Sequence, residues 1–120
     1  MPMDRRDFAK EWVEAWNSHE LERVLSHYDD AVTLVSPRAR LVLGVEDGAV
    51  RGKGALRDYI KRALEKVPDL AFTLDRVFSG VNSIVVEFHT SDGRHGAELM
   101  EFAKNGRVAR VTAHYASERT

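Results

Sequence analysis

The sequence contains no cysteine. This absence excludes disulfides, thiolate metal ligands and cysteine nucleophiles, and it suits a protein of a reducing compartment. Long hydrophobic runs are also missing, since no apolar stretch approaches the ~20 residues of a transmembrane helix. The first residues, Met1 to Arg6, lead into a charged helix rather than into the apolar segment of a signal peptide. We therefore expect a cytoplasmic protein.

An excess of charge of one sign is absent as well. The chain has 18 Lys and Arg residues against 19 Asp and Glu residues, a formal net charge of −1. Both halves of the chain are balanced in the same way. Neither half offers the one-signed field that attracts polyphosphates or anionic lipids, so we expect no nucleic acid and no membrane as partner.

What the chain does have is material for a core. Its 120 residues are 43% hydrophobic and 31% charged, within the range of one globular domain and outside that of disordered or fibrous chains. No internal repeat, low-complexity segment or linker interrupts it. We expect a single domain over residues 1–120.

Apolar residues at the spacing of a helix face are concentrated in the first half of the chain. Asp4 is a predicted N-cap, and Phe8, Trp12, Ala15 and Trp16 recur at the spacing of one helix face. A second helix is predicted to start at Asn17, with Glu20 three residues later, and to run to Asp29-Asp30, with Tyr28 on its apolar face. Gly52-Lys53-Gly54 leads into a third helix, which Pro68 ends.

Strand patterns dominate the second half. Residues 70–78, 83–90, 96–103 and 107–115 are rich in β-branched and aromatic side chains, and Ser79-Gly80, Asp92-Gly93 and Asn105-Gly106 separate them as hairpin turns. A further strand is predicted over residues 31–35, where Ser36-Pro37 stops it, and residues 40–45 are compatible with another. Three helices and an antiparallel meander predict an α+β fold.

Three segments carry a resemblance to a known family. They are WVEAWNSHELERVLSHYDDAVTLVSP, VRGKGALRDYI and FAKNGRVARVTAHY. Their order and spacing resemble the SnoaL-like branch of the NTF2-like superfamily over roughly residues 8–116. The resemblance implies a strongly curved sheet wrapped around helices into a cone with a pocket at its open end, and a homodimer formed through the convex sheet face. This superfold hosts isomerases, cyclases, dehydratases, epoxide hydrolases and non-catalytic binders, so the fold does not assign the function.

The family register also implies which side chains face the pocket. Met100 corresponds to an inward position, and strand alternation then places Glu98 and Phe102 on the same side. The expected lining of a mostly apolar, aromatic pocket consists of Trp12, Trp16, Tyr59, Ile60, Val86, Phe88, Met100, Phe102, Val111 and Ala113, with His27, Glu98 and Tyr115 as its polar groups. Such a pocket is typical of a small apolar ligand, here a hydrophobic carbonyl compound.

Glu98 is the sharpest candidate for chemistry. A carboxyl group among apolar side chains loses solvation, which raises its pKa toward the range useful for a general acid or base near neutral pH. Two alternatives stay open. In the first, the expected register of the strand that carries Glu98 is wrong by one residue. In the second, Glu98 lies at the solvated mouth of the pocket and only pairs with an arginine.

The remaining candidates have structural alternatives. His27 is a second acid–base candidate, or an exposed histidine stabilised by a helix C-terminus. Tyr115 is a hydrogen-bond donor to a ligand oxygen, or a core ring with a wet hydroxyl. Trp12 and Trp16 are pocket wall or core. The other histidines are scattered without metal-ligand spacing, so we expect no metal and no cofactor.

Departures from the steroid-isomerase relatives are informative. Those enzymes use a tyrosine, a neutral carboxylic acid and a base aspartate. In this sequence Trp12, Met100 and Ser36 stand at or near the corresponding positions, which excludes that mechanism. An arginine–aspartate epoxide-hydrolase array is equally unsupported.

Two functions therefore remain in view, with a third behind them. The first is a cofactor-independent isomerase, cyclase or dehydratase in which Glu98 moves a proton and His27 or Tyr115 orients the substrate oxygen. The second is a non-catalytic ligand-binding or dimerisation module. The third, a protein-interaction role on the outer surface, has no peptide-binding signature to support it.

Overall fold

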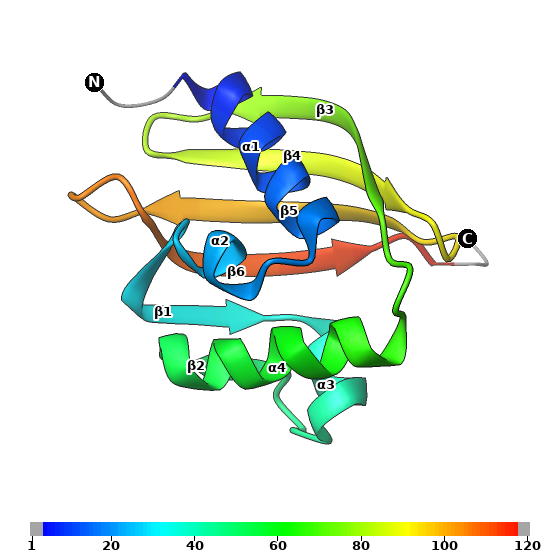
Figure 1. Cartoon of the computed structure of the whole chain (residues 1–120). Coiled ribbons are helices and arrows are strands. Elements are labelled where there is room, and N and C mark those ends of the chain that lie inside the picture. Colours follow the sequence, from blue (N-terminus) through cyan, green and yellow to red (C-terminus); the bar gives the residue numbers. More distant parts are fainter. Residues whose placement is uncertain (1–3, 118–120) are drawn as a thin grey trace.

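A computed structural model describes residues 4–117, so the expected domain limits at residues 1 and 120 lie outside the described residues. Helices and a sheet form two layers (Figure 1). The elements in chain order are α1 (Arg5–Ser18), α2 (Leu21–Leu25), β1 (Tyr28–Val35), α3 (Pro37–Leu43), β2 (Ala49–Arg51), α4 (Lys53–Lys66), β3 (Phe72–Ser79), β4 (Ser83–Thr90), β5 (His95–Phe102) and β6 (Val108–Tyr115). None of the helices in this range is long and apolar enough to cross a membrane.

The six strands form one mixed sheet in the order β2-β1-β6-β5-β4-β3. The last four strands are an antiparallel meander, as the turn dipeptides predict. β1 joins the meander by pairing parallel to β6, and β2 pairs antiparallel to β1. The α+β class and the meander are therefore confirmed.

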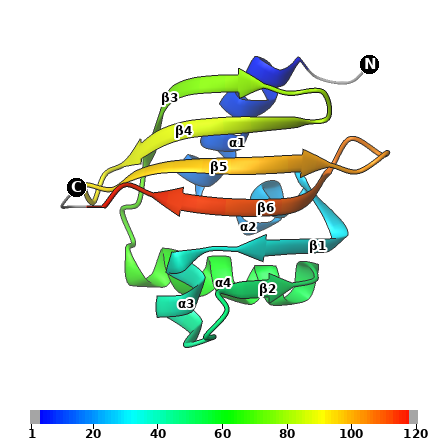
Figure 2. The same cartoon turned by 180° about the vertical axis from the view of Figure 1, so that it is seen from behind.

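The helices leave one face of the meander open. α1 and α2 lie over one face of the sheet in Figure 1, and Figure 2 shows the other face of β3 to β6 without a covering helix. Burial alternates accordingly along β4 and β5, with one buried residue at every second position. Glu98, Met100 and Phe102 are all on the covered side. The predicted parity of β5 is correct.

The curvature implied by the family resemblance is not seen. The sheet is twisted but not strongly curled, so the cone part of the expectation is not confirmed. The layer between helices and sheet is filled with large side chains instead, including Trp12, Tyr28 and Phe88, each almost completely buried. What positions a site here is a packed interface with local gaps.

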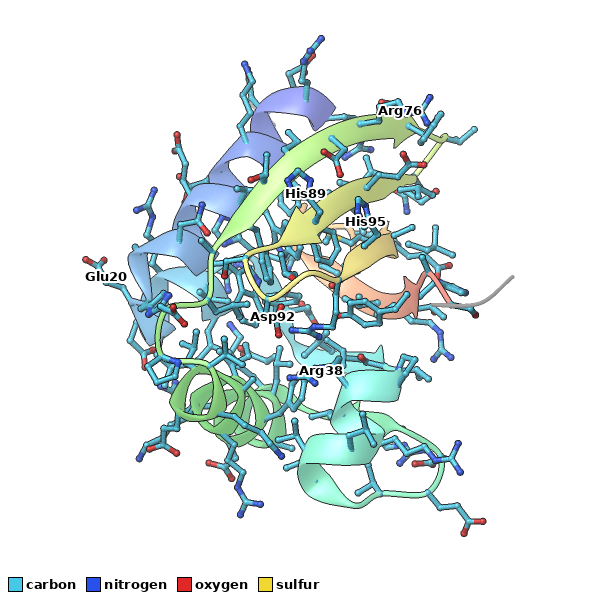
Figure 3. The ribbon with its side chains drawn as sticks, turned by 90° about the vertical axis from the view of Figure 1, so that its right-hand side faces the viewer. Glu20, Arg38, Arg76, His89, Asp92 and His95 are labelled. Atoms are coloured by element: carbon cyan, nitrogen blue, oxygen red, sulfur yellow. The ribbon has the colours of Figure 1, made fainter. Side chains whose placement is uncertain are left out.

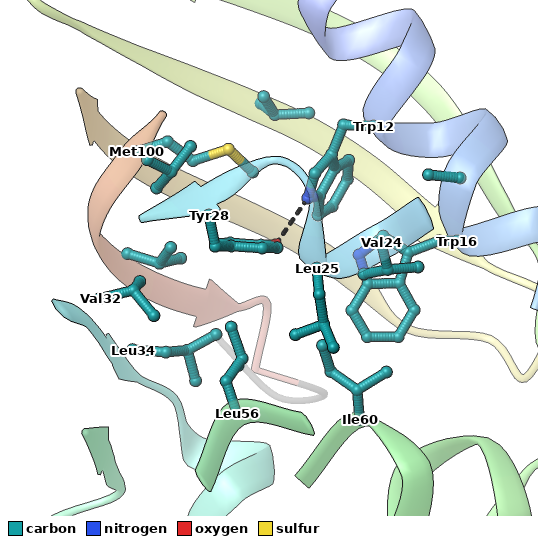
Figure 4. Close-up of a cluster of buried hydrophobic side chains, with 14 of the residues drawn as sticks. Trp12, Trp16, Val24, Leu25, Tyr28, Val32, Leu34, Leu56, Ile60 and Met100 are labelled. Atoms are coloured by element: carbon teal, nitrogen blue, oxygen red, sulfur yellow. Dashed lines mark hydrogen bonds between the residues drawn. The ribbon is translucent and has the colours of Figure 1, made fainter. Parts of the chain in front are cut away.

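The first helix follows its sequence pattern. The Asp4 carboxylate accepts a hydrogen bond from the Arg6 backbone N–H at 2.8 Å, which confirms the predicted N-cap. Phe8, Trp12 and Trp16 are buried against the sheet. Trp12 is completely buried, and its indole Nε1–H donates to the Tyr28 hydroxyl at 2.9 Å (Figure 4).

The predicted second helix begins and ends in the wrong places. Asn17 belongs to α1, and its side-chain amide bonds both the carbonyl and the N–H of Phe72, at 3.0 and 2.7 Å. α2 starts only at Leu21, after Glu20, which makes no side-chain capping bond. Tyr28 opens β1 instead of continuing the helix. A bond between residues far apart in the sequence has replaced the local cap.

The possible strand at residues 40–45 is wrong, because residues 37–43 form a helix. Ser36 is its N-cap and accepts a hydrogen bond from the Arg38 N–H at 3.1 Å, while Pro37 occupies the first turn, where its missing N–H costs nothing. The chain therefore has four helices within the described residues, not three. Ser36-Pro37 ends β1 as predicted and starts α3 at once.

The return from α3 to β2 depends on one glycine. Gly48 is buried, has φ of +65°, and a Cβ at this position would lie 2.8 Å from the Ser36 carbonyl oxygen. Gly44, which follows α3, has a similar φ of +70° but open space where its Cβ would be. Both glycines therefore need a positive φ, but only at Gly48 would a side chain also collide with a neighbouring backbone atom.

We predict that Gly48→Ala destabilises the protein more than Gly44→Ala. Both changes place a side chain in the left-handed region, at a cost of about 1–2 kcal/mol. Gly48→Ala adds the collision with the Ser36 carbonyl, for a further cost of about 1–3 kcal/mol. Chemical denaturation of both variants measures the difference. Equal losses of unfolding free energy would show that the loop can move away from Ser36.

Candidate functional site

Glu98 lies in the middle of β5, between Val86 of β4 and Ala113 of β6. Only 7% of its surface is exposed. It points from the sheet toward the helix layer, where every neighbouring inward position on β5 is apolar or small. The only acidic side chain that the described chain buries is therefore placed by strand alternation alone.

A small cavity opens beside this carboxyl group. Its volume is about 30 Å³, room for one or two water molecules. The wall is contributed by the end of α1, the start of α3, α4, the strands β1, β3, β5 and β6, the residues before β3 and the β4–β5 turn. Its residues are Trp16, Tyr28, Leu34, Ser36, Arg38, Tyr59, Ala63, Leu70, Phe72, Arg94, Glu98, Ala113 and Tyr115.

Burial controls the protonation of Glu98. Loss of solvation raises its pKa from 4.5 to about 8, and no charged or hydrogen-bonding neighbour in the described chain offsets the rise. At neutral pH most molecules therefore carry a neutral, protonated Glu98, in equilibrium with a minor ionised form. A group of this kind can both give and take a proton near physiological pH.

Three tyrosines surround the carboxyl group. Burial and the Glu98 carboxylate raise the pKa of Tyr59 to about 12, and the same two causes raise the pKa of Tyr28 and of Tyr115 still further. All three hydroxyl groups therefore remain protonated donors at any physiological pH. Tyr28 accepts from Trp12 and keeps its own O–H proton to donate, so all three tyrosine hydroxyls are possible donors at the cavity.

An unused donor adds to this set. The indole Nε1–H of Trp16 is buried and makes no hydrogen bond of ordinary length and angle within residues 4–117, although it lies near enough to the Tyr28 hydroxyl to lower the pKa of Tyr28. A buried donor without a partner is uncommon in a folded protein, since it forfeits the hydrogen bond it made with water. Because Trp16 also lines the cavity, the free N–H marks a place where a water molecule or a ligand oxygen would be held.

The structure brings five of the predicted site residues together at the cavity. They are Trp16, Tyr59, Glu98, Ala113 and Tyr115. The other predicted pocket residues do not line it, because tight packing fills the rest of the interface. These residues are Trp12, Ile60, Val86, Phe88, Met100, Phe102 and Val111, all of them buried in the core.

Aromatic contacts explain why so much of the expected pocket is solid. Phe88 packs at 5.4 Å from Trp12 and at 4.9 Å from Phe72, measured between ring centroids. Trp16 packs on the same Phe72 ring at 5.1 Å. These rings occupy the volume that a cone would leave for a ligand.

His27 is placed away from the cavity. Its ring packs edge-on against Phe8 at 5.5 Å, and Phe8 in turn contacts Phe102, four residues along β5 from Glu98. Its Nε2 lies 3.4 Å from a Glu11 carboxylate oxygen. The structure therefore does not bring His27 and Glu98 together, and Tyr115 is the predicted partner that reaches the site.

Two arginines at the cavity were not among the predicted residues. Arg38 comes from the first turn of α3 and Arg94 from the turn between β4 and β5, where it forms an ion pair with Asp92. Figure 3 labels Arg38 and Asp92. Their sequence context gives no signal, because each is one of many scattered basic residues. Only the packing of α3 against the end of the sheet places both at one opening.

The histidines of the open sheet face form no metal centre. His89 and His95 stack at 5.5 Å between ring centroids, and His89 Nδ1 lies 2.9 Å from an Asp75 carboxylate oxygen (Figure 3). Within residues 4–117, however, no three or more His, Asp or Glu side chains are arranged to hold a metal ion.

Comparison with known proteins is consistent with this architecture. Residues 9–116 match the sequence model of a protein family that is described as the SnoaL-like domain. A SnoaL-like protein of unknown function from Burkholderia thailandensis is 34% identical, with a TM-score of 0.90 over 98% of this chain and 100% of the other. No curated protein matches the chain.

More distant structures share the fold. A proposed isomerase of the SnoaL-like family from Agrobacterium tumefaciens is 19% identical, with a TM-score of 0.75 over 94% of this chain and 97% of the other. A proposed ketosteroid isomerase from Kribbella flavida is 18% identical, with a TM-score of 0.75 over 97% and 80%. At these identities the similarity is one of fold alone.

The buried carboxyl group predicts an unusual pH dependence of stability. The unfolded chain loses the Glu98 proton near pH 4.5, whereas the folded chain keeps it to about pH 8. Between these values the folded state binds more protons, so stability falls as pH rises, by up to about 1.4 kcal/mol per pH unit. We expect Glu98→Gln to remove this contribution.

Denaturation of the wild type, Glu98→Gln and Glu101→Gln between pH 5 and 8 measures the effect. Glu101 is the matched control, an exposed glutamate on the same strand. The advantage of Glu98→Gln over the wild type should grow with pH, while Glu101→Gln stays parallel to the wild type. Parallel curves for all three proteins would mean that Glu98 ionises normally in the folded state.

Proposed function

We propose that this protein, which belongs to the SnoaL-like family of the NTF2-like superfamily, is an enzyme. It catalyses cofactor-independent proton transfer on an apolar carbonyl compound. The observation that carries the proposal is Glu98, a buried carboxyl group whose pKa of about 8 suits it to exchange protons at neutral pH. The reaction class is isomerisation or elimination next to a carbonyl group.

Glu98 acts as a single proton shuttle in this proposal. Its ionised form removes a proton from the carbon next to the substrate carbonyl, and the C–H bonding electrons move to the carbonyl oxygen as an enolate. The protonated Glu98 then returns the proton to another carbon for an isomerisation, or to a leaving hydroxyl group for a dehydration. The carboxylate is regenerated in either case, so no cofactor and no net proton are consumed.

Hydroxyl groups stabilise the enolate oxygen. Tyr59 and Tyr115 both border the cavity with Glu98, and both keep their protons because their pKa values are raised. Neutral donors aimed at a developing oxyanion in a dry site lower the barrier more than the same groups do in water. The free N–H of Trp16 is a third donor in the same wall. The steroid-isomerase residues are not needed for this arrangement.

A non-catalytic binding module is the second candidate. The cavity of about 30 Å³ favours it, because that space does not hold a carbonyl substrate of any size unless side chains at the opening move. The placement of His27 away from the site also favours it, since no histidine lines the cavity beside Glu98. Both candidates use the same residues, so the Glu98 carboxyl group decides between them.

Proton exchange in deuterated water tests the catalytic proposal. A panel of apolar aryl and alicyclic ketones is incubated with the protein, and loss of the α-proton NMR signal is followed. We expect the exchange rate to fall by about 10²-fold or more in Glu98→Gln, and to rise with pH in the wild type until Glu98 is ionised near pH 8. Glu101→Gln should behave as the wild type.

Exchange that persists unchanged in Glu98→Gln would reject Glu98 as the shuttle. Ligand binding without any exchange above the solvent rate would support the binding module instead. Tyr59→Phe provides a further check, because loss of one oxyanion donor should slow exchange without moving the pH midpoint. Circular dichroism shows whether each variant is folded.

We also propose that two copies pair through the open face of the meander. A partly apolar band crosses this face, in which Phe78, Val85, Leu99 and Thr112 are cross-strand neighbours on four strands. In this band, the large aromatic residue Phe78 is 48% exposed. Acidic and basic residues, such as Glu87 and Arg110, lie on both sides of the band. A second copy would therefore cover apolar surface without meeting charge of one sign.

Sedimentation at micromolar concentration measures the pairing. The wild type should be a dimer and Leu99→Lys a monomer, because a charge in the centre of the band would be buried without a partner. Leu41→Lys is the control, an exposed leucine on α3 that is not part of the band. A monomeric wild type, or a dimer that survives Leu99→Lys, would contradict the assignment.

A further inference from the structure

A larger hollow, the vestibule, adjoins the cavity beside Glu98. The vestibule has a volume of about 340 Å³ and shares Arg38, Arg94 and Tyr115 with the inner cavity. It lies where α3, the β4–β5 turn and the end of β6 meet, and Figure 3 shows Arg38 and Asp92 at this end of the molecule. A ligand that reaches Glu98 through it passes both arginines.

The two arginines differ in whether they form an ion pair with a carboxylate. Arg94 binds the Asp92 carboxylate at 3.0 Å, and its guanidinium lies 5.4 Å from the centre of the Tyr115 ring. Arg38 takes part in none of the ion pairs found within residues 4–117. Among the described residues, the vestibule therefore carries one positive charge that no carboxylate neutralises.

The charged groups are arranged in depth. The Glu98 carboxylate raises the pKa of Tyr59 and Tyr115, while Arg38 and Arg94 act on the same two tyrosines in the opposite direction. Neither arginine affects the pKa of Glu98, which burial alone determines. Burial separates these groups, since Glu98 and Tyr59 are buried whereas Tyr115, Arg38 and Arg94 are half-buried.

The walls between these groups are apolar. Leu41, which is 71% exposed, and Pro37 line the vestibule on the α3 side, and Ala116 lines it beyond the end of β6. An exposed leucine beside an unpaired arginine offers both an apolar and an anionic contact to one molecule. The deeper Trp16 N–H, buried and without a partner, offers a hydrogen bond to a neutral oxygen.

We propose that the vestibule binds the carboxylate of an amphipathic organic acid, with Arg38 as its main partner, so that the neutral carbonyl end of the same molecule points toward Tyr59, Tyr115 and Glu98. A carboxylate suits this place because it carries one charge, equal to the one unpaired guanidinium, and because guanidinium binds it through two parallel hydrogen bonds. This inference rests on the proposed function for the identity of the reacting carbonyl, and it narrows the substrate class to oxo acids.

A matched pair of probes tests the carboxylate requirement. Binding of 4-oxo-4-phenylbutanoate and of 4-oxo-4-phenylbutanamide is measured by calorimetry at pH 7 for the wild type, Arg38→Gln and Arg40→Gln. Arg40 is the matched control, an exposed arginine on the same helix that lines neither the cavity nor the vestibule. The wild type and Arg40→Gln should bind the acid about tenfold or more tightly than the amide, a difference of about 1.4 kcal/mol.

Arg38→Gln should bring the two dissociation constants to within about threefold of each other by weakening the acid and leaving the amide unchanged. Equal binding of acid and amide by the wild type, binding of neither probe, or a preference that survives Arg38→Gln would overturn the inference. Arg94→Gln, in which Asp92 loses its partner, should also weaken the acid, and it provides a second variant if Arg38→Gln does not fold.

Glu98→Gln separates this inference from the proposed function. The variant should retain its preference for the acid, since the arginines are unchanged, while it loses proton exchange. Acid preference combined with exchange that does not depend on Glu98 would reject the catalytic proposal and leave the carboxylate subsite standing. Exchange that depends on Glu98 but acts equally on the acid and the amide would reject the subsite alone.

Discussion

The strand register of β4, β5 and β6 is the constraint on which the site depends. Each residue of β5 faces either the helix layer or the open sheet face, and the pairings with β4 and β6 leave no freedom to change sides. Glu98 is therefore held inside by the same alternation that buries Met100 and Phe102. A shift of one residue would expose all three and bury Leu99 and Glu101 instead.

Holding a carboxyl group there has an energetic cost. The folded protein avoids a buried charge by keeping Glu98 protonated, and above its pKa it must either bear that charge or open locally. No ion pair within the described residues relieves this cost. Aromatic packing around Trp12, Phe72 and Phe88, and the Trp12–Tyr28 hydrogen bond, supply the stabilising contacts of the surrounding layer. A group maintained at a cost to stability is a strong candidate for a functional one.

Much of the fold follows from local patterns. Hairpin turns such as Asp92-Gly93 and Asn105-Gly106 place the meander, and alternation places Glu98 on its inner side. The second helix was misplaced because the Asn17 amide bonds Phe72, a contact across 55 residues that no local pattern contains. The sequence pattern does not predict α3, because Ser36-Pro37 indicates a strand end as well as a helix start.

The site was less predictable than the fold for the same reason. Alternation identifies inward residues but not which of them border a gap, so core residues such as Val86 and Val111 were grouped with Ala113. Arg38 and Arg94 meet only because α3 packs beside the β4–β5 turn, and His27 lies elsewhere because α2 ends against Phe8. These contacts join residues that are far apart in the sequence, so local sequence patterns do not predict them.

The central claim is that the folded protein holds Glu98 protonated at neutral pH. Carbon-13 NMR of the side-chain carboxyl groups, titrated from pH 4 to 10, tests it directly, with Glu98→Gln identifying the resonance by its loss. The account predicts a midpoint near pH 8 for that resonance. A midpoint near the ordinary glutamate value of about 4.3 would contradict it.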